Sequence, residues 1–222
     1  MIDSNQTLGQ LATAYPGATR VFLRHRLDFC CGGRMKLVDA CRSAGLDADG
    51  IVAEIAAADA TPAAKRWDLE PLADLVDFII VRFHESLRGD LPVLVEAAER
   101  VERVHGAKPS CPHGLAVLLR QAEIELSQHL DKEEVVLFPA LVKGGRGVRV
   151  EAPVRAMMME HDDHGAILQR LRALTDDYTP PPEACTTWRA LYNGLDTLET
   201  ELRQHIHLEN HVLFPRAMRE DD

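Results

Sequence analysis

One segment of the chain occurs twice, and this duplication limits the fold more than any other feature. Residues 123–139 read EIELSQHLDKEEVVLFP, and residues 199–215 read ETELRQHIHLENHVLFP. The two copies share the frame E-x-E-L-x-Q-H-x-x-x-E-x-x-V-L-F-P, with apolar positions at helical spacing. An internal repeat identifies the unit from which a fold is built. The unit is predicted to be an amphipathic helix that ends or kinks at its proline, Pro139 or Pro215.

Each copy carries a histidine and a glutamate on its apolar stripe. His129 precedes Glu133 by four residues, and His205 precedes Glu209 by four. Residues four apart lie on the same face of a helix, so these side chains are expected to be buried together. A buried, ionised carboxylate costs several kcal/mol unless it is paired or bound to a metal ion. Two such carboxylates in equivalent helices therefore indicate a metal site.

A further histidine precedes each copy at almost the same distance. His84 lies 45 positions before His129, and His161 lies 44 positions before His205. Four long helical patterns joined by short loops follow residue 70, and no segment has the pattern of a strand. The expected fold is all-α, with an antiparallel four-helix bundle made of two helical hairpins. Folding one hairpin against the other would bring four imidazoles and two carboxylates to the centre.

Six ligands of this kind favour a dinuclear site. They exceed the four ligands of a tetrahedral zinc ion. Carboxylate and imidazole ligands without thiolate favour iron or manganese. We expect two iron ions per chain, bridged by carboxylate and oxo groups.

Some assignments around this site have alternatives. His164 lies one turn from His161 and could replace it, although the hairpin spacing and the acid that follows favour His161. Glu125 and Glu201 lie one turn before the repeated histidines. They could orient the ligand imidazoles, line a path for ions, or be solvated surface charges. The same supporting role is assigned to Glu160.

Two further pairs of possible metal ligands fall outside this pattern. His207 and His211 are four residues apart, but their counterparts in the first copy are an aspartate and a valine, so we expect them on the outer face. Glu102 and His105 match the Glu-x-x-His motif of ferritin-like bundles only once, which we take as coincidental.

The first 60 residues have a different pattern, in which short helical segments are separated by turns. We expect a small helical domain over residues 1–60, a linker over 61–69 and the bundle over 70–222. Cys30 and Cys31 precede two glycines and a helix start, a position that lowers a thiol pKa and favours a redox or metal role. Alternatively, the pair only packs in a turn. The remaining cysteines are expected to be incidental: Cys41, Cys111 and Cys185.

Composition limits the partners. The 35 acidic and 25 basic residues give a net charge of −10, and no basic run is present. This argues against nucleic acid or an anionic membrane as the main partner. The N-terminus has no signal-peptide pattern, and five cysteines without disulfide-framework spacing fit a reducing compartment. We therefore expect a soluble, cytoplasmic protein.

The paired HxxxE frame, the two earlier histidines and the motif LDFCCGG together resemble a known family. The sequence is similar to the iron-sulfur cluster repair di-iron proteins, the repair-of-iron-centres family, in which a short N-terminal domain precedes a hemerythrin-like domain. The resemblance covers essentially the whole chain and implies that Cys30 and Cys31 are the family's cysteine pair. It implies these metal ligands: His84, His129, Glu133, His161, His205 and Glu209.

The resemblance also implies a function. Such a protein repairs iron-sulfur clusters damaged by nitrosative or oxidative stress, with damaged iron-sulfur proteins as partners and iron supply as the expected route. A homodimer is compatible with it. Oxygen-carrying hemerythrins use five histidines and two carboxylates, whereas only four histidines are placed here, which favours labile iron. The alternatives are a nitric oxide reductase, and a sensor that binds nitric oxide or oxygen at the same two irons.

Overall fold

A computed structural model describes residues 2–59, 65–142 and 150–219 of the chain. These residues form helices and turns without a strand, so the predicted all-α class is confirmed. The chain divides into two compact units, which are described separately. The bundle unit comprises Phe78–Ala140 and Val150–Leu202. The thiol unit, named for the cysteine pair it contains, comprises Met1–Asp77, Leu141–Arg149 and Arg203–Asp222.

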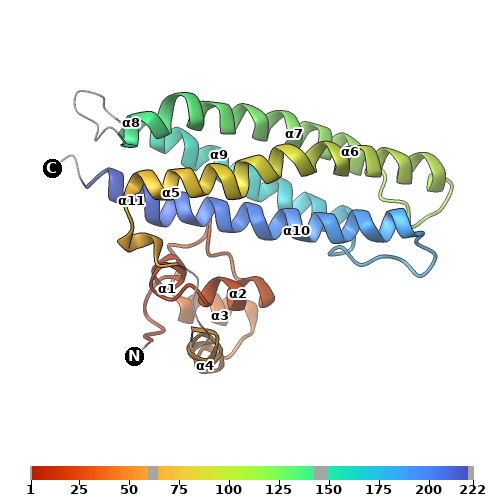
Figure 1. Cartoon of the computed structure of the whole chain (residues 1–222). Coiled ribbons are helices and arrows are strands. Elements are labelled where there is room, and N and C mark those ends of the chain that lie inside the picture. The colour runs from red at the N-terminus through yellow and green to blue at the C-terminus, as the bar shows by residue number, and fades with distance from the viewer. Residues whose placement is uncertain (1, 60–64, 143–149, 220–222) are drawn as a thin grey trace. The chain divides into compact units, whose positions relative to one another are not determined.

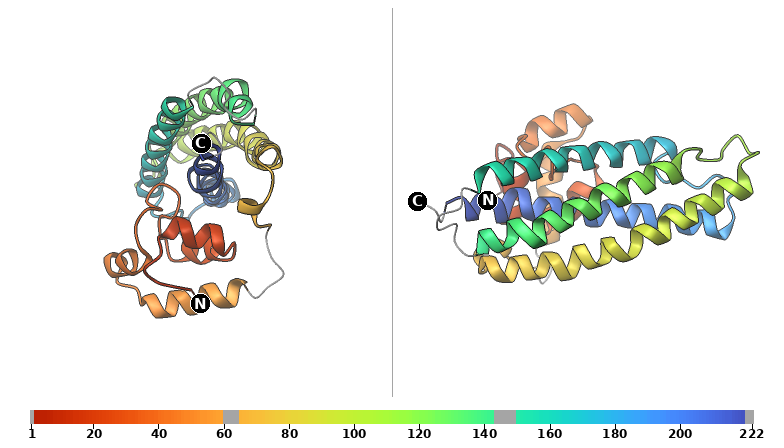
Figure 2. Two further views of the ribbon diagram at one scale, coloured as in Figure 1. Left: turned by 90° about the vertical axis from the view of Figure 1, so that its left-hand side faces the viewer. Right: turned by 90° about the horizontal axis from the view of Figure 1, so that it is seen from above.

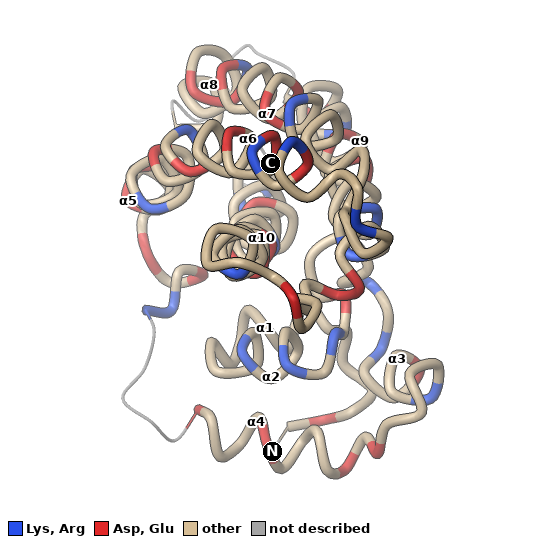
Figure 3. Tube along the Cα trace, turned by 90° about the vertical axis from the view of Figure 1, so that its right-hand side faces the viewer, with Lys and Arg blue, Asp and Glu red and all other residues tan. Residues whose placement is uncertain are grey.

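The bundle unit consists mainly of four long helices. They lie side by side in Figure 1 and in both views of Figure 2, with α7 packed against both α6 and α9. Leucine, valine and alanine side chains on the facing stripes form its core. Acidic and basic residues are interspersed along the helices (Figure 3), as the absence of a basic run predicts. The four helices are α6 (Glu85–His105), α7 (Leu115–Lys132), α9 (Glu151–Leu174) and α10 (Thr186–Leu208), the last of which belongs to this unit as far as Leu202.

Wider, π-helical turns interrupt the helices where predicted ligands lie. In the bundle unit, η2 (Ile80–His84) follows α5 (Leu72–Ile79), and η3 (Glu133–Leu137) follows α7. The carbonyl of Glu133 accepts its hydrogen bond from Phe138, five residues on, instead of from the fourth. π-turns of this kind are frequent at functional sites.

The repeated prolines do not end their helices, so of the two predicted effects, an end or a kink, only the first is wrong. Pro139 lies inside α8 (Phe138–Val142), directly after η3. In the thiol unit, Pro215 lies inside α11 (Phe214–Ala217), directly after η4 (Glu209–Leu213). A proline ring clashes with the carbonyl four residues earlier and lacks an N–H group. The wider turn before each proline gives room for the ring, so the helix continues.

The thiol unit has a hydrophobic core of its own. Leu11, Phe22, Phe29, Leu37 and Ile55 are fully buried at its centre. Four short helices surround this core, and the last turns of α10, with η4 and α11, belong to the same unit. These helices are α1 (Leu8–Ala14), α2 (Ala18–Arg24), α3 (Leu37–Ala44) and α4 (Ala48–Asp59).

The predicted boundaries at residues 60 and 69 remain a prediction. Residues 61–64 of the expected linker lie outside the described residues. Trp67–Leu69 form a short 3-10 turn, η1, whose Trp67 carbonyl accepts a hydrogen bond from Arg216 at 2.8 Å. No helix in the described part of the chain is long and apolar enough to cross a membrane.

Candidate metal centre

The bundle unit brings three predicted histidines and one predicted glutamate together. His84 ends η2, His129 lies in the last turn of α7, Glu133 begins η3, and His161 lies in the first half of α9. All four side chains have a relative exposure of 0%. Amphipathic spacing places them on the buried stripes of their helices, as the sequence predicts.

The Glu133 carboxylate lies between two imidazoles. One of its oxygens is 3.6 Å from His84 Nε2, and the other is 3.4 Å from His129 Nε2. His161 Nε2 lies 3.1 Å from His129 Nε2. Ligand atoms of His129, Glu133 and His161 lie within 4.8 Å of one another. Each oxygen of Glu133 faces a different imidazole, and a carboxylate that bridges two metal ions needs its oxygens to point to two sides in this way.

Two other glutamates fix the orientation of these rings. Glu134 accepts a hydrogen bond from His84 Nδ1 at 2.9 Å, and Glu160 accepts one from His129 Nδ1 at 2.9 Å. Because a carboxylate can only accept, the proton of each ring is on Nδ1, and the Nε2 lone pair is available to a metal ion. This pairing of carboxylate and imidazole is common around histidine metal ligands.

These two outer carboxylates remain ionised. Burial raises the pKa of Glu160, but hydrogen bonds from Lys132 and His129 outweigh it and leave the pKa below its usual value. The pKa of Glu134 is likewise lowered, because hydrogen bonds from His84 and Arg88 outweigh burial. Both groups are therefore effective acceptors at neutral pH.

The hydrogen bonding of Glu133 fits a bound cation. Both of its carboxylate oxygens are buried and accept no hydrogen bond from any described residue. A carboxylate in that situation costs several kcal/mol unless a positive charge compensates it. Histidine and carboxylate ligands without thiolate suit iron or manganese.

The second copy of the repeat places its pair in the thiol unit. His205 lies in the last turn of α10, and Glu209 begins η4. Their side chains both have 0% exposure, and His205 Nε2 is 2.8 Å from Glu209 Oε1. The spacing of four residues therefore has the expected effect in both copies.

Comparison with known sequences identifies the family. The model for "Hemerythrin HHE cation binding domain" matches residues 75–217, and "Domain of Unknown function (DUF542)" matches residues 4–59. The iron-sulfur cluster repair protein YtfE of Yersinia pseudotuberculosis serotype IB (strain PB1/+) is 48% identical over 216 residues, which cover 97% of each chain. The protein of the same name from Yersinia pestis (strain Pestoides F) gives the same identity and coverage. The chain belongs to the YtfE family of iron-sulfur cluster repair proteins.

Membership of the YtfE family confirms the resemblance seen in the sequence, whereas the roles of individual residues remain predictions. Of the two alternative histidines, His161 has its Nε2 atom 3.1 Å from His129 Nε2. His164 is also buried, with its ring centre 4.7 Å from that of His129. It lines a cavity of about 120 Å³ with Glu125, Gln128, Lys132, Glu160 and Asp163.

The predicted supporting glutamates lie in three different settings. Glu160 contacts a ligand imidazole, as described above. Glu125 accepts a hydrogen bond from Gln121 at 2.8 Å and lines the small cavity. Glu201 accepts hydrogen bonds from Arg82 and Ser86, each at 2.8 Å. Sequence reasoning missed Glu134, because its counterpart in the second copy is an asparagine, so the repeat frame gives no signal.

The cysteine pair of the thiol unit forms a compact cluster. Cys30 Sγ lies 3.8 Å from Cys31 Sγ and 3.2 Å from Asp28 Oδ1. Arg203 Nη1 is 3.3 Å from the same Asp28 oxygen and 3.6 Å from Cys30 Sγ. Cys30 is buried, and Cys31 is partly exposed. Ligand atoms of Asp28, Cys30 and Cys31 lie within 4.8 Å of one another, so the cluster could hold a metal ion.

The expected lowering of the thiol pKa is wrong for Cys30. The hydrogen bond with Cys31 raises the pKa of Cys30 well above its usual value, and burial and the charge of Asp28 add to this, whereas Arg203 opposes it. The pair also lies several residues before α3, which begins at Leu37. The helix dipole acts mainly within the first turn of a helix, and the cysteine pair precedes that turn, so the dipole of α3 is not expected to lower the thiol pKa.

His207 and His211 are not on the outer face, which corrects that prediction. His207 is 3% exposed, and its ring centre lies 5.5 Å from that of Phe29. Burial, followed by the neighbouring His211, lowers the pKa of His207 to about 3. His211 Nε2 donates a hydrogen bond to the Cys30 carbonyl at 2.9 Å. The prediction failed because this face of the second copy packs, within the thiol unit, against Phe29 and the backbone of Cys30.

Proposed function

We propose that this chain is a di-iron protein that repairs iron-sulfur clusters damaged by nitrosative or oxidative stress, by supplying iron to the damaged proteins. The buried carboxylate of Glu133, which faces imidazoles and accepts no hydrogen bond from the described residues, is the observation that carries the proposal. The relatives named as iron-sulfur cluster repair proteins support it. The proposal places the protein in the cytoplasm and is compatible with a homodimer.

In this proposal, two iron ions are held by both copies of the repeat. The bundle unit contributes three histidines and Glu133, and the second copy contributes His205 and Glu209. The match to a cation-binding family across residues 75–217, which include all six residues, supports their assignment as metal ligands. When bound, iron supplies redox and Lewis-acid chemistry. Carboxylate and oxo bridges between the two ions belong to the same proposal.

The chain's own residues prepare the site before metal binds. Glu134 and Glu160 hold the Nδ1 protons of His84 and His129, so the Nε2 lone pairs face Glu133. Ring orientations fixed in this way reduce the reorganisation needed to bind a metal ion. Four histidines, compared with the five of oxygen-carrying hemerythrins, favour release of the bound iron over permanent storage.

The small cavity beside His164 is proposed as the path for iron. Three carboxylates line it, from Glu125, Glu160 and Asp163, and Lys132 is the only lysine or arginine among the described residues of its wall. A wall with this charge attracts cations. This favours iron traffic over the alternatives, nitric oxide reduction and gas sensing, which need a route for neutral diatomic molecules.

The cysteine cluster is proposed to take part in transferring iron to the damaged protein. Thiolates bind iron well, and the partly exposed Cys31 lies beside Cys30 and Asp28. Replacing both cysteines should therefore reduce repair while iron remains bound at the histidine site. Loss of bound iron in that double variant would contradict this division of roles.

A reconstitution experiment tests the proposed function. A nitric-oxide-damaged iron-sulfur dehydratase is incubated with the iron-loaded protein and a chelator that holds free iron. Activity should return with the wild-type protein and with the control Asp162→Asn, but not with Glu133→Gln. If free iron restores the dehydratase in the absence of chelator while the iron-loaded protein never does, iron supply is wrong. Steady production of nitrous oxide from nitric oxide would instead favour the reductase.

A further inference from the structure

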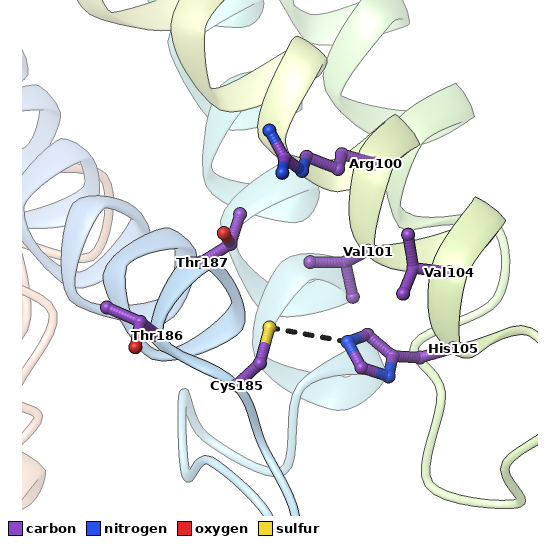
Figure 4. A pocket seen from close by; sticks show the side chains of 7 residues that line it. All are labelled: Arg100, Val101, Val104, His105, Cys185, Thr186 and Thr187. Atoms are coloured by element: carbon purple, nitrogen blue, oxygen red, sulfur yellow. Dashed lines mark hydrogen bonds between the residues drawn. The ribbon is translucent and has the colours of Figure 1, made fainter.

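A second cavity lies in the bundle unit, between the end of α6 and the start of α10. Its volume is about 320 Å³, close to the lower limit of pockets that bind small molecules. It contains none of the proposed iron ligands. Figure 4 shows its lining residues: Arg100, Val101, Val104, His105, Cys185, Thr186 and Thr187.

A thiol and an imidazole face each other in this cavity. Cys185 Sγ lies 3.3 Å from His105 Nε2, and the two groups point toward one another in Figure 4. Cys185 is a free, exposed cysteine. A thiol within hydrogen-bond reach of a base is the arrangement of an activated nucleophile. His105, whose Glu-x-x-His motif was taken above as coincidental for a di-iron site, is thus one half of this pair.

Neighbouring contacts hold both partners in place. The His105 ring packs against Trp188, with ring centres 5.1 Å apart. Before Cys185, the Glu183 carboxylate accepts a hydrogen bond from Ser110 at 2.5 Å, and the Ala184 carbonyl accepts one from Arg189 at 3.1 Å. The thiol and the imidazole are thus positioned by the fold before any ligand binds, which lowers the cost of reaching a reactive geometry.

The charges around the cavity favour an anionic ligand. Cys185 directly precedes the 23-residue helix α10, whose first N–H groups favour negative charge near them. Arg100 extends from α6 toward α10 above Thr187 in Figure 4, and no described carboxylate lies within ion-pair distance of its guanidinium. Neither aspartate nor glutamate is among the described residues that line the cavity. Val101 and Val104 provide an apolar wall.

We propose that Cys185 and His105 form a thiol-modification site for small disulfides that carry carboxylate groups. His105 Nε2 accepts the Cys185 proton, and the sulfur attacks one sulfur of the disulfide. A bond forms between Cys185 and that sulfur, the original S–S bond breaks, and the leaving thiolate takes the proton from His105. Cys185 is oxidised to a mixed disulfide, and the small disulfide is reduced to one thiol. Arg100 binds a carboxylate of the incoming molecule.

Disulfide exchange with the full-length protein tests this proposal. Oxidised glutathione serves as the carboxylate-bearing probe and cystamine as a cationic probe. Peptide mass mapping after timed quenching gives the rate of adduct formation at each of the five cysteines. Cys185 should take up oxidised glutathione fastest and should prefer it over cystamine, whereas the buried Cys111 should remain unmodified.

Two variants separate the role of each group. His105→Asn should slow adduct formation at Cys185 about tenfold or more with both probes, because the proton acceptor is lost. Arg100→Gln, which changes an exposed side chain, should slow the reaction with oxidised glutathione but not with cystamine. Thermal unfolding of each variant checks that the fold is retained. An unchanged rate in His105→Asn, or an unchanged probe preference in Arg100→Gln, would overturn the proposal.

Discussion

The Nδ1 atom of His129 lies 2.9 Å from a carboxylate oxygen of Glu160, on the opposite side of the ring from the Nε2 atom that faces Glu133. This contact fixes both the proton and the orientation of the imidazole. It also joins two helices of the bundle unit, because His129 belongs to α7 and Glu160 to α9. Metal affinity should therefore depend on a residue that is not itself a ligand.

Replacing Glu160 should weaken iron binding without removing a ligand. Glu160→Gln should lower iron affinity about 10–100-fold, because an amide no longer holds the Nδ1 proton with a full negative charge. Competition with a chromogenic chelator measures this affinity. The matched control is Asp162→Asn, since Asp162 is an exposed acid two residues further along the same helix. Equal affinities in the two variants would show that the Glu160 contact does not support the site.

The identity of the third bundle-unit ligand can be tested by comparing two histidines. His161→Ala should lose bound iron, because His161 Nε2 faces His129 Nε2 at 3.1 Å. His164→Ala should keep iron at equilibrium and only slow its uptake or release, because His164 lines the cavity that we propose as the path. Iron content and chelator-driven release rates measure the two effects. If iron is lost from His164→Ala alone, His164 is the ligand and His161 is not.

Iron should stabilise the folded protein, and Glu133 should be necessary for this effect. A ligand that binds only the native state adds about 2.7 kcal/mol to the free energy of unfolding when its free concentration is 100 times its Kd. Chelation should therefore lower the unfolding temperature of the wild-type protein. In Glu133→Gln, the iron-loaded and chelated samples should unfold alike. Urea or thermal unfolding measures the difference, and a persistent iron effect in Glu133→Gln would contradict the assignment.

The loop that contains Cys30, Cys31 and Gly33 should be sensitive to an added methyl group where it packs against His211 of the second repeat copy. A Cβ at Gly33 would clash with the His211 ring and with the Phe29 carbonyl. Gly33→Ala should therefore lower the free energy of unfolding by about 1–3 kcal/mol. Gly89 is the control, because it is helical and a Cβ there meets nothing within 4 Å. Gly89→Ala should stabilise by about 0.5–1 kcal/mol. Equal effects of the two substitutions would contradict the packing described for His211.

Much of the fold and of the candidate metal site could be predicted from residue spacing alone. Histidine and glutamate four residues apart had to share a helix face, and the apolar residues around them showed which face is buried. Matching offsets then identified His84 and His161. These inferences depend on local periodicity, which the final structure preserves.

Other features depend on contacts between distant residues, which spacing cannot reveal. Glu134 has no counterpart in the second copy, and its hydrogen bond to His84 exists only after two helices pack together. The raised pKa of Cys30 reflects burial and neighbours that are close only in the folded chain. The burial of His207 depends on Phe29, which is far from it in the sequence and reaches it only in the folded thiol unit. The reactive geometry at Cys185 depends on a histidine 80 residues away.

The most direct test of the account is the metal content of the purified protein, measured together with its optical spectrum. We expect two irons per chain, with near-ultraviolet charge-transfer bands from an oxo-bridged pair. Both should be lost in Glu133→Gln and retained in Asp162→Asn. A protein that carries no iron after anaerobic loading, or that keeps both irons when Glu133 is replaced, would contradict the central claim that these buried side chains hold a di-iron centre.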